Sequence, residues 1–323
     1  MICQVVCFGI NLKGIIMILA FQTGKGSTDN LLKEFTERVS NSKYCVFDHE
    51  KYQREYPSPS GVLKNPTHQQ AELHWPDLIN TKLDDVSAYM FWGFMRNTKA
   101  IYDMAKRRNK DFYFLDHAYI YHKKHSIYHK NLAHNPYFRV VKNEFVLTTI
   151  KNTDDTRLLK MREQFKNGNE LDILPWKKNG SYILIIPPSY YLCSWLNIDS
   201  TKLMNQSIEE IKKYTDREIK IRYKKPTRNY NPVPLEEDID KAWAVVSFQS
   251  SVSIRAINRG IPSFLMKPNY SASQPMSLSD LSKIETPIYP DNRYEWLSSL
   301  CNNQFLKEEI RSGEAMRLID EHN

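Results

Sequence analysis

Residues 235–264, with the sequence LEEDIDKAWAVVSFQSSVSIRAINRGIPSF, constrain the fold of this chain more than any other stretch. They predict a short helix, a buried strand, a serine-rich turn, a second helix, and a Gly-Ile-Pro exit into another strand. Such alternation is typical of a parallel α/β sheet. The turn also places hydroxyls and backbone N–H groups at a helix N-terminus, which favours phosphate binding there.

The same alternation recurs along the rest of the chain and predicts a doubly wound parallel sheet in each half. A length of 323 residues is enough for two domains, each with its own core. The boundaries we expect are an extension at 1–16, a first Rossmann-like domain at 17–150, a linker at 151–180, a second such domain at 181–290, and C-terminal helices at 291–323.

Positive charge is spread through the chain, which has a net charge of +8 and a pI near 9.0. Dense points are Arg107 with Arg108, and Lys123 with Lys124. Any one of them is explained by a solvated face, but together they favour a polyanionic partner, of which nucleic acid is the commonest. Phosphate-bearing small substrates are the alternative. Our candidates for nucleic-acid phosphate contacts are these four residues.

Metal, disulfide and membrane signals are weak. Five cysteines occur without a Cys-x2-Cys pair, which argues against a cysteine zinc site and fits a reducing cytosol. The histidines between His117 and His134 have Lys and Tyr neighbours, so we expect an exposed basic face and no metal. Lys13 interrupts the apolar start, which stays short of the ~20 residues that a membrane span needs. We therefore expect a cytoplasmic protein without a membrane segment.

A glycine turn follows the first predicted strand, at Gly24-Lys25-Gly26-Ser27. It does not satisfy the P-loop pattern, which needs Lys directly before Ser or Thr and an earlier glycine. Gly24 and Gly26 instead allow the backbone to approach a ligand at the carboxyl end of a strand. A tight connection with no ligand is the alternative.

Asp116 and His117 end the buried strand FYFLDHAY. The carboxyl ends of strands line the ligand crevice of an open α/β sheet. A carboxylate beside an imidazole there can act as a general base toward a hydroxyl. The alternative is that Asp116 caps a helix and His117 packs.

Hydroxyl and basic side chains are expected together near the second-half turn. Ser250, Ser251 and Ser253 lie at the predicted helix start, and Arg222 and Lys224 lie at the end of the preceding predicted strand. We expect the two strand ends to lie near each other, where cations strengthen an anion site at a helix N-terminus. Helix capping by the serines alone is the alternative.

These residues resemble a known family. The run 242–264 resembles the donor-binding half of glycosyltransferases with the GT-B fold, and 221–226 is similar to the basic strand end that often precedes it there. Trp92-Gly93, with 112–121 and 137–144, looks like the N-terminal half of the bacterial and phage branches. The resemblance, over about residues 17–320, implies two facing Rossmann-like domains with the active site in the cleft between them.

The resemblance also implies the chemistry. A nucleotide diphosphate sugar, UDP-linked by expectation, is the co-substrate, and neither a cofactor nor a metal is needed. Gly24, Gly26 and the serine and basic residues above would hold the donor. Arg255 departs from the pattern, since many members have a Glu there that binds the donor's ribose. Arg255 puts ribose recognition in doubt or favours a further phosphate contact.

Composition and size are similar to those of phage glycosyltransferases that modify 5-hydroxymethylated bases in DNA. This likeness implies transfer of glucose, or of a pentose such as arabinose, to hydroxymethylcytosine or a related pyrimidine in double-stranded DNA. Asp116 would be the base, with His117 beside it, in a monomer in the host cytoplasm. Two alternatives remain: a transferase acting on a cell-surface glycan or polyol phosphate, and a non-catalytic nucleic-acid-binding protein.

Overall fold

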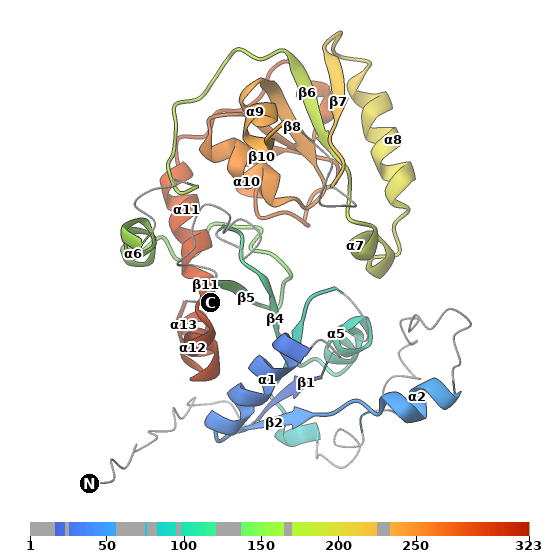
Figure 1. The fold of residues 1–323 in the computed structure, drawn as a ribbon, viewed down its shortest axis with the longest axis vertical. Coiled ribbons are helices and arrows are strands. Elements are labelled where there is room, and N and C mark those ends of the chain that lie inside the picture. The colour runs from blue at the N-terminus through green and yellow to red at the C-terminus, as the bar shows by residue number, and fades with distance from the viewer. Residues whose placement is uncertain are drawn as a thin grey trace. The chain divides into compact units, whose positions relative to one another are not determined.

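The computed structural model describes residues 17–22, 26–55, 75, 83–94, 98–120, 137–164, 170–224 and 233–322. They form two compact α/β units, shown as a ribbon in Figure 1. Of the described residues, the first unit contains those up to 118, 137–145 and 305–322, and the second contains 119–120 and 146–304. The predicted α/β class with parallel sheets is confirmed.

The first unit has a six-stranded sheet in the order β11-β5-β4-β3-β1-β2. Strands β1 to β4 are parallel, while β5 is antiparallel to β4. Its elements are β1 (Ile18–Phe21), α1 (Gly26–Arg38), β2 (Ser42–Cys45), α2 (His49–Glu55), a 3-10 turn (Leu83–Asp85), β3 (Ala88–Trp92), α5 (Thr98–Arg107), β4 (Asp111–His117), β5 (Phe138–Lys142), β11 (Gln304–Phe305), α12 (Lys307–Arg311) and α13 (Glu314–Glu321).

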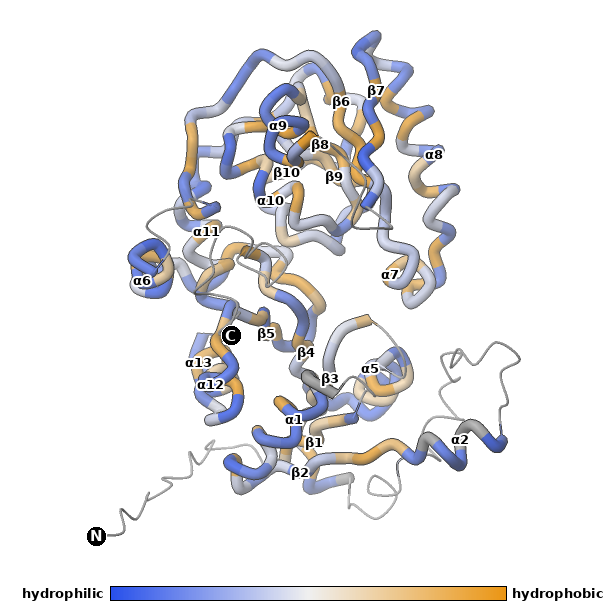
Figure 2. The backbone as a smooth tube through the Cα atoms, in the orientation of Figure 1, coloured by the Kyte–Doolittle hydropathy of each residue, from blue (hydrophilic) through white to orange (hydrophobic). Residues whose placement is uncertain are grey.

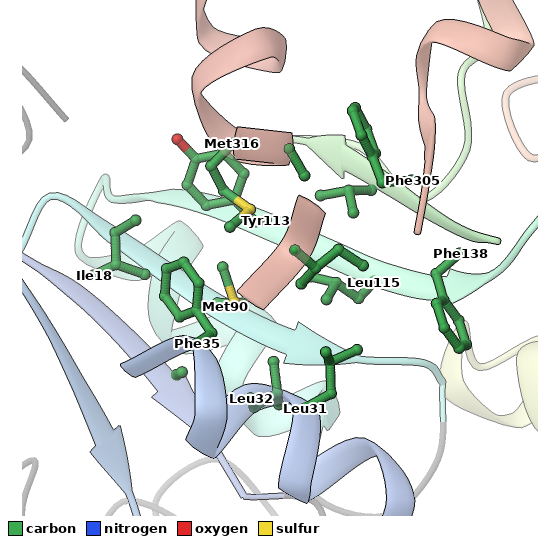
Figure 3. Close-up of a cluster of buried hydrophobic side chains, with 14 of the residues drawn as sticks. Ile18, Leu31, Leu32, Phe35, Met90, Tyr113, Leu115, Phe138, Phe305 and Met316 are labelled. Atoms are coloured by element: carbon green, nitrogen blue, oxygen red, sulfur yellow. The ribbon is translucent and has the colours of Figure 1, made fainter. Parts of the chain in front are cut away.

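Both faces of this sheet are apolar, because its central strands are covered on each side. On one face Met90 and Leu115 pack against Phe35 of α1 and Met316 of α13 (Figure 3). On the other face the alternate strand residues, such as Phe91, pack against α5 and a group of aromatic rings. Successive strand side chains point to opposite faces of the sheet, and here the side chains on both faces are apolar. This is typical of a parallel sheet between two helical layers.

The second unit has a five-stranded parallel sheet in the order β10-β9-β8-β6-β7. Its elements are α6 (Thr156–Gln164), β6 (Tyr182–Ile186), α7 (Tyr190–Trp195), α8 (Ser200–Ile211), β7 (Glu218–Ile221), α9 (Leu235–Asp240), β8 (Ala242–Ser247), α10 (Ser251–Asn258), β9 (Ser263–Leu265), β10 (Ser277–Leu278), α11 (Arg293–Asn302), and 3-10 turns at Gln274–Met276 and Leu281–Lys283.

Alternate residues of these strands bury two separate cores. Ile183 and Ile185 face the layer that includes Ile211 of α8. Leu184 faces the opposite layer, with Ile239 of α9 and other apolar residues. Figure 2 shows the alternation of hydrophobic and hydrophilic residues along α8, whose apolar side packs on the sheet.

Each sheet has one topological switch point. In the first unit the chain goes from β1 outward to β2 and then returns to place β3 on the other side of β1. In the second unit β6, β7 and β8 repeat that path. The crevice of an open α/β sheet lies where the strand order reverses, outside the carboxyl ends of the strands. The expected ligand edges are therefore β1/β3 and β6/β8.

The division into units differs from the predicted boundaries at the C-terminus. The expected separate helical segment at 291–323 is divided, with α11 in the second unit and α12 and α13 in the first. The last helix is tied to the first sheet because Asp320 accepts hydrogen bonds from Tyr113 at 2.7 and 2.8 Å and from Lys142 at 3.0 Å. Among the described residues, no helix is both long and apolar enough to cross a membrane.

Candidate functional site

The switch point of the second unit is formed by the ends of β6 and β8 and the start of α10. Ile186 and Ser247 are paired at the last register position of the two strands. Ser250 adopts an extended N-cap conformation, and its hydroxyl accepts a hydrogen bond from the Val252 amide at 3.2 Å. The serine-rich turn is therefore a helix start, as its sequence predicts, and it follows the carboxyl end of β8.

Ser253 does not face this edge. Its side chain is buried in the first turn of α10 and shares a 2.7 Å hydrogen bond with Ser247 at the end of β8. The pair ties the helix start to the strand end and satisfies two buried hydroxyls. Ser253 thus has a structural role in this arrangement, and Ser250 and Ser251 are the partly exposed hydroxyls of the turn.

The ends of β7 and β8, which we expected to lie near each other, do not belong to neighbouring strands. Strand β6 lies between them, so they are two strand spacings, about 10 Å, apart. The Arg222 side chain is also engaged, since it pairs with the buried Asp238 of α9 and donates to the Val233 carbonyl at 3.1 Å. Lys224, by contrast, is exposed and has no ion pair among the described residues.

Asp238 of α9 pairs with Lys220 of β7 and with Arg222, so its pKa in the folded protein differs from its pKa in the unfolded chain. Burial alone would raise the pKa of Asp238, but hydrogen bonds from Lys220 and Arg222 outweigh burial and hold the pKa below its ordinary value. A lowered pKa means that these pairs stabilise the fold fully above about pH 4, the unfolded value, and that the stabilisation is lost as pH falls through the folded pKa.

Asp238→Asn is expected to lower the free energy of unfolding by about 2 kcal/mol near neutral pH. The difference from the wild type should shrink as the pH falls below about 4 toward the folded pKa, where the wild-type carboxyl also becomes protonated. Urea unfolding near neutral pH and at a pH below about 4 measures it. The exposed Asp216→Asn is the control, with little expected effect at either pH. A loss of unfolding free energy that is equal at both pH values would contradict an ion pair that depends on the ionised Asp238 carboxylate.

Arg255 is held by two carboxylates and does not point to the helix start. Its guanidinium donates to Glu170 at 2.6 Å and to Glu236 at 3.1 Å, and its side chain is 11% exposed. The ion pairs connect α10 to the first turn of α9 and to the segment that precedes β6. A further phosphate contact by Arg255 would require these pairs to break.

Asp116 and His117 lie at the carboxyl end of β4 in the first unit. One oxygen of Asp116 accepts from the His117 amide at 2.7 Å, and the other accepts from Arg139 of β5 at 2.8 Å. Each oxygen has a further lone pair for a substrate hydroxyl. The His117 and Trp92 rings meet at nearly right angles, with centroids 5.8 Å apart. Asp116 does not cap a helix in the described part of the chain.

The remaining predicted residues fall into three groups. Arg107 ends α5 and Arg108 follows it, shortly before β4 begins at Asp111, so both lie at the opposite edge of the sheet from Asp116. Across a seven-residue strand this is a separation of about 20 Å. Gly26 is the first residue of α1, after β1. Gly24, Lys123 and Lys124 lie outside the described residues.

Sequence reasoning missed the charged partners of the candidate residues. Arg139, Asp238, Glu170 and Glu236 come from other elements, and no local pattern points to them. The only available signal was the acidic first turn of the helix at 235–240, which contains two of the four. In the described part of the chain, no three His, Cys, Asp or Glu residues are grouped so that they could hold a metal ion.

No protein-family model matches this chain, and no curated protein matches it. Solved structures similar to it include KpsC of Thermosulfurimonas dismutans, as its beta Kdo 2,7 transferase, with 12% identity, a TM-score of 0.47, and coverage of 94% of this chain and 99% of that one. The beta Kdo 2,4 transferase of the same protein has 11% identity, a TM-score of 0.45, and coverage of 88% and 89%. The glycotransferase of kitacinnamycin has 8% identity, a TM-score of 0.30, and coverage of 94% and 97%. The activities in these names belong to those proteins.

Proposed function

We propose that this chain is a glycosyltransferase that uses a nucleotide diphosphate sugar. The observation that supports it most is the start of α10, with the partly exposed Ser250 and Ser251, at the switch point between β6 and β8. The residues there are those that carry the resemblance to the donor-binding half of GT-B glycosyltransferases. Both lines of reasoning lead to the same turn.

The proposed chemistry follows from the charge of the leaving group. A nucleoside diphosphate gains negative charge as its bond to the sugar breaks. A helix N-terminus and hydroxyl donors stabilise that charge, and more so in the transition state than in the bound donor. Ser250 now uses its hydroxyl as the acceptor for the Val252 amide. A bound phosphate oxygen would take over as acceptor for that amide.

Ser251→Asp is the sharpest test of the donor site. A carboxylate in the first turn favours the helix dipole, so the variant should be at least as stable as the wild type. The same carboxylate repels a diphosphate, so the affinity for UDP should fall by at least about tenfold. Calorimetric titration measures the affinity, and thermal unfolding measures the stability.

The matched control is Thr156→Asp, which adds the same charge in the first turn of α6 in the same unit. It should leave UDP affinity unchanged. Equal affinities in the wild type and Ser251→Asp would remove the α10 start from the donor site. A loss of affinity that accompanies a loss of stability would point to misfolding.

For the acceptor, we propose a 5-hydroxymethylated pyrimidine in DNA, with Asp116 accepting the hydroxyl proton. The support is the positive charge of the chain and the partly exposed carboxylate at the end of β4. The assay is incubation with several nucleotide sugars and hydroxymethylcytosine-containing DNA, followed by mass analysis of the nucleosides. A mass gain equal to one sugar residue is expected. Transfer to a soluble glycan or polyol phosphate but not to DNA would overturn the acceptor and leave the sugar transfer standing.

A further inference from the structure

Three exposed tyrosines and a lysine lie at the carboxyl ends of β6 and β7. Tyr190 and Tyr191 are 70% and 59% exposed, and Tyr223 is 62% exposed. Lys224 follows Tyr223 and is also exposed. We call these four residues the tyrosine patch. Large aromatic side chains at such exposure forgo burial that would stabilise the fold, so their presence here calls for a physical reason.

The backbone brings the patch to the ligand edge of the second unit. After Ile186 the chain passes Pro187 and Pro188 and enters α7 at Tyr190, and α7 then leads into α8 (Figure 1). Tyr223 follows the end of β7, where the Arg222 amide still donates to the Ile185 carbonyl at 3.0 Å. The patch is therefore beside the switch point that contains the start of α10.

The three tyrosines of the patch share one side of the sheet, and strand alternation directs Lys224 to the α9 side. Lys220 and Arg222 both reach Asp238 on the α9 side. Strand alternation directs Ile219 and Ile221 away from that side, and Ile219 packs in the core that α8 covers. Tyr223 follows Arg222, whose amide makes the last bond to β6, so the same alternation directs Tyr223 toward the α8 side, and α7 packs against α8. Within α7 the buried residues are Leu192, Cys193 and Trp195, so the two tyrosines are left on its outer surface.

The charges around the patch suit an anion. Lys224 has no ion pair among the described residues. The acid that follows α7, Asp199, is turned to the Thr201 and Lys202 amides at 2.9 Å as the N-cap of α8. The Tyr190 and Tyr191 rings meet edge to face at 5.9 Å, so a flat face of at least one ring stays open. Flat aromatic faces beside a cation bind planar bases that carry phosphate.

We infer that the tyrosine patch stacks the nucleobase of a phosphate-bearing nucleotide, with Lys224 beside the phosphate. The inference deepens the proposed function, on which it rests, because it names where the base of the nucleotide donor binds. Bases of a single nucleic-acid strand share the same chemistry. Titration with UDP and with a single strand separates the two sources.

The test measures binding of UDP, inorganic pyrophosphate and a short oligothymidylate to the full chain by calorimetric titration. The variants are Tyr190→Ala with Tyr191→Ala, and Tyr223→Ala. Each is expected to weaken UDP binding by about tenfold, because a stacking face is lost. Pyrophosphate, which has no base, should bind to them as it does to the wild type. Tyr223→Phe should retain most of the affinity, since it keeps the ring.

Tyr214→Ala is the matched control, since Tyr214 is a 44% exposed tyrosine that precedes β7, at the other edge of the sheet. It should leave every affinity unchanged. If oligothymidylate binds, UDP does not, and the tyrosine variants weaken oligothymidylate binding, the stacked base is that of a nucleic-acid strand. The inference is overturned if the UDP affinity is equal in all variants. It is also overturned if pyrophosphate affinity falls as much as UDP affinity, or if neither UDP nor oligothymidylate binds.

The two proposals fail separately. If sugar is transferred but UDP affinity does not depend on the tyrosines, only the inference of base stacking is overturned. Tyrosine-dependent binding of UDP without any sugar transfer would overturn the glycosyltransferase and leave a base-stacking site.

Discussion

Gly260→Ala is expected to destabilise the second unit by about 3 kcal/mol or more. Gly260 has a φ of +78°, in the left-handed region that disfavours a side chain. An added Cβ would lie 2.0 Å from the Pro175 carbonyl oxygen and 3.2 Å from the Trp176 Cα. That backbone cannot move aside cheaply, because the Leu174 amide donates to Asn258 at 2.7 Å and the Lys177 amide donates to Gly260 at 2.8 Å.

Gly93→Ala separates the two causes. Gly93 also has a positive φ, +68°, but an added Cβ there would have nothing within 4 Å. Its expected cost is the left-handed conformation alone, about 1–2 kcal/mol. Urea unfolding followed by circular dichroism compares the two variants with the wild type. Equal costs for both would show that the contact with Pro175 is not what requires a glycine at 260.

Asp116→Asn is expected to lower the rate of sugar transfer by about a hundredfold or more, if Asp116 is the proposed base. The amide cannot take a proton from the acceptor hydroxyl. It retains an oxygen of the same shape that can accept from the His117 amide, whose bond to Asp116 is 2.7 Å long. The fold should therefore survive. Steady-state rates with a donor and a hydroxymethylated acceptor measure the effect.

Asp111→Asn is the control for charge on the same strand. Asp111 begins β4, at the opposite end from Asp116, and pairs with Lys142 at 3.1 Å. Its variant should transfer sugar at the wild-type rate. Full activity in Asp116→Asn would remove the residue from the mechanism and leave its pair with Arg139 as a structural contact.

The order of elements in the second half was predictable because it rests on local patterns. Residues 235–264 predict helix, strand, turn, helix and strand, and the structure has α9, β8, α10 and β9 there in that order. An unbroken apolar run can only be a buried element, and a serine before a helix satisfies its first amides. The antiparallel β5 had no comparable signal, since its direction depends on the neighbouring β4.

The roles of single site residues were less predictable, because a charge is satisfied by whatever the fold brings to it. Arg222 and Arg255 look like anion ligands in the sequence. In the structure they compensate Asp238, Glu170 and Glu236. Ser253 looks in the sequence like a hydrogen-bond donor to phosphate, but in the structure it shares a hydrogen bond with Ser247 in the core. Arg107 and Asp116 are close in sequence, but they lie at opposite edges of one sheet.

The sequence by itself determined the α/β class, the buried strands and the helix start at Ser250. Each depends on hydrophobic periodicity or backbone conformation over a few residues. The tertiary structure decided the strand order, the return of α12 and α13 to the first unit, and the partner of every buried charge. These depend on contacts between residues far apart in the chain, such as Tyr113 with Asp320, whose geometry exists only once the sheets are formed.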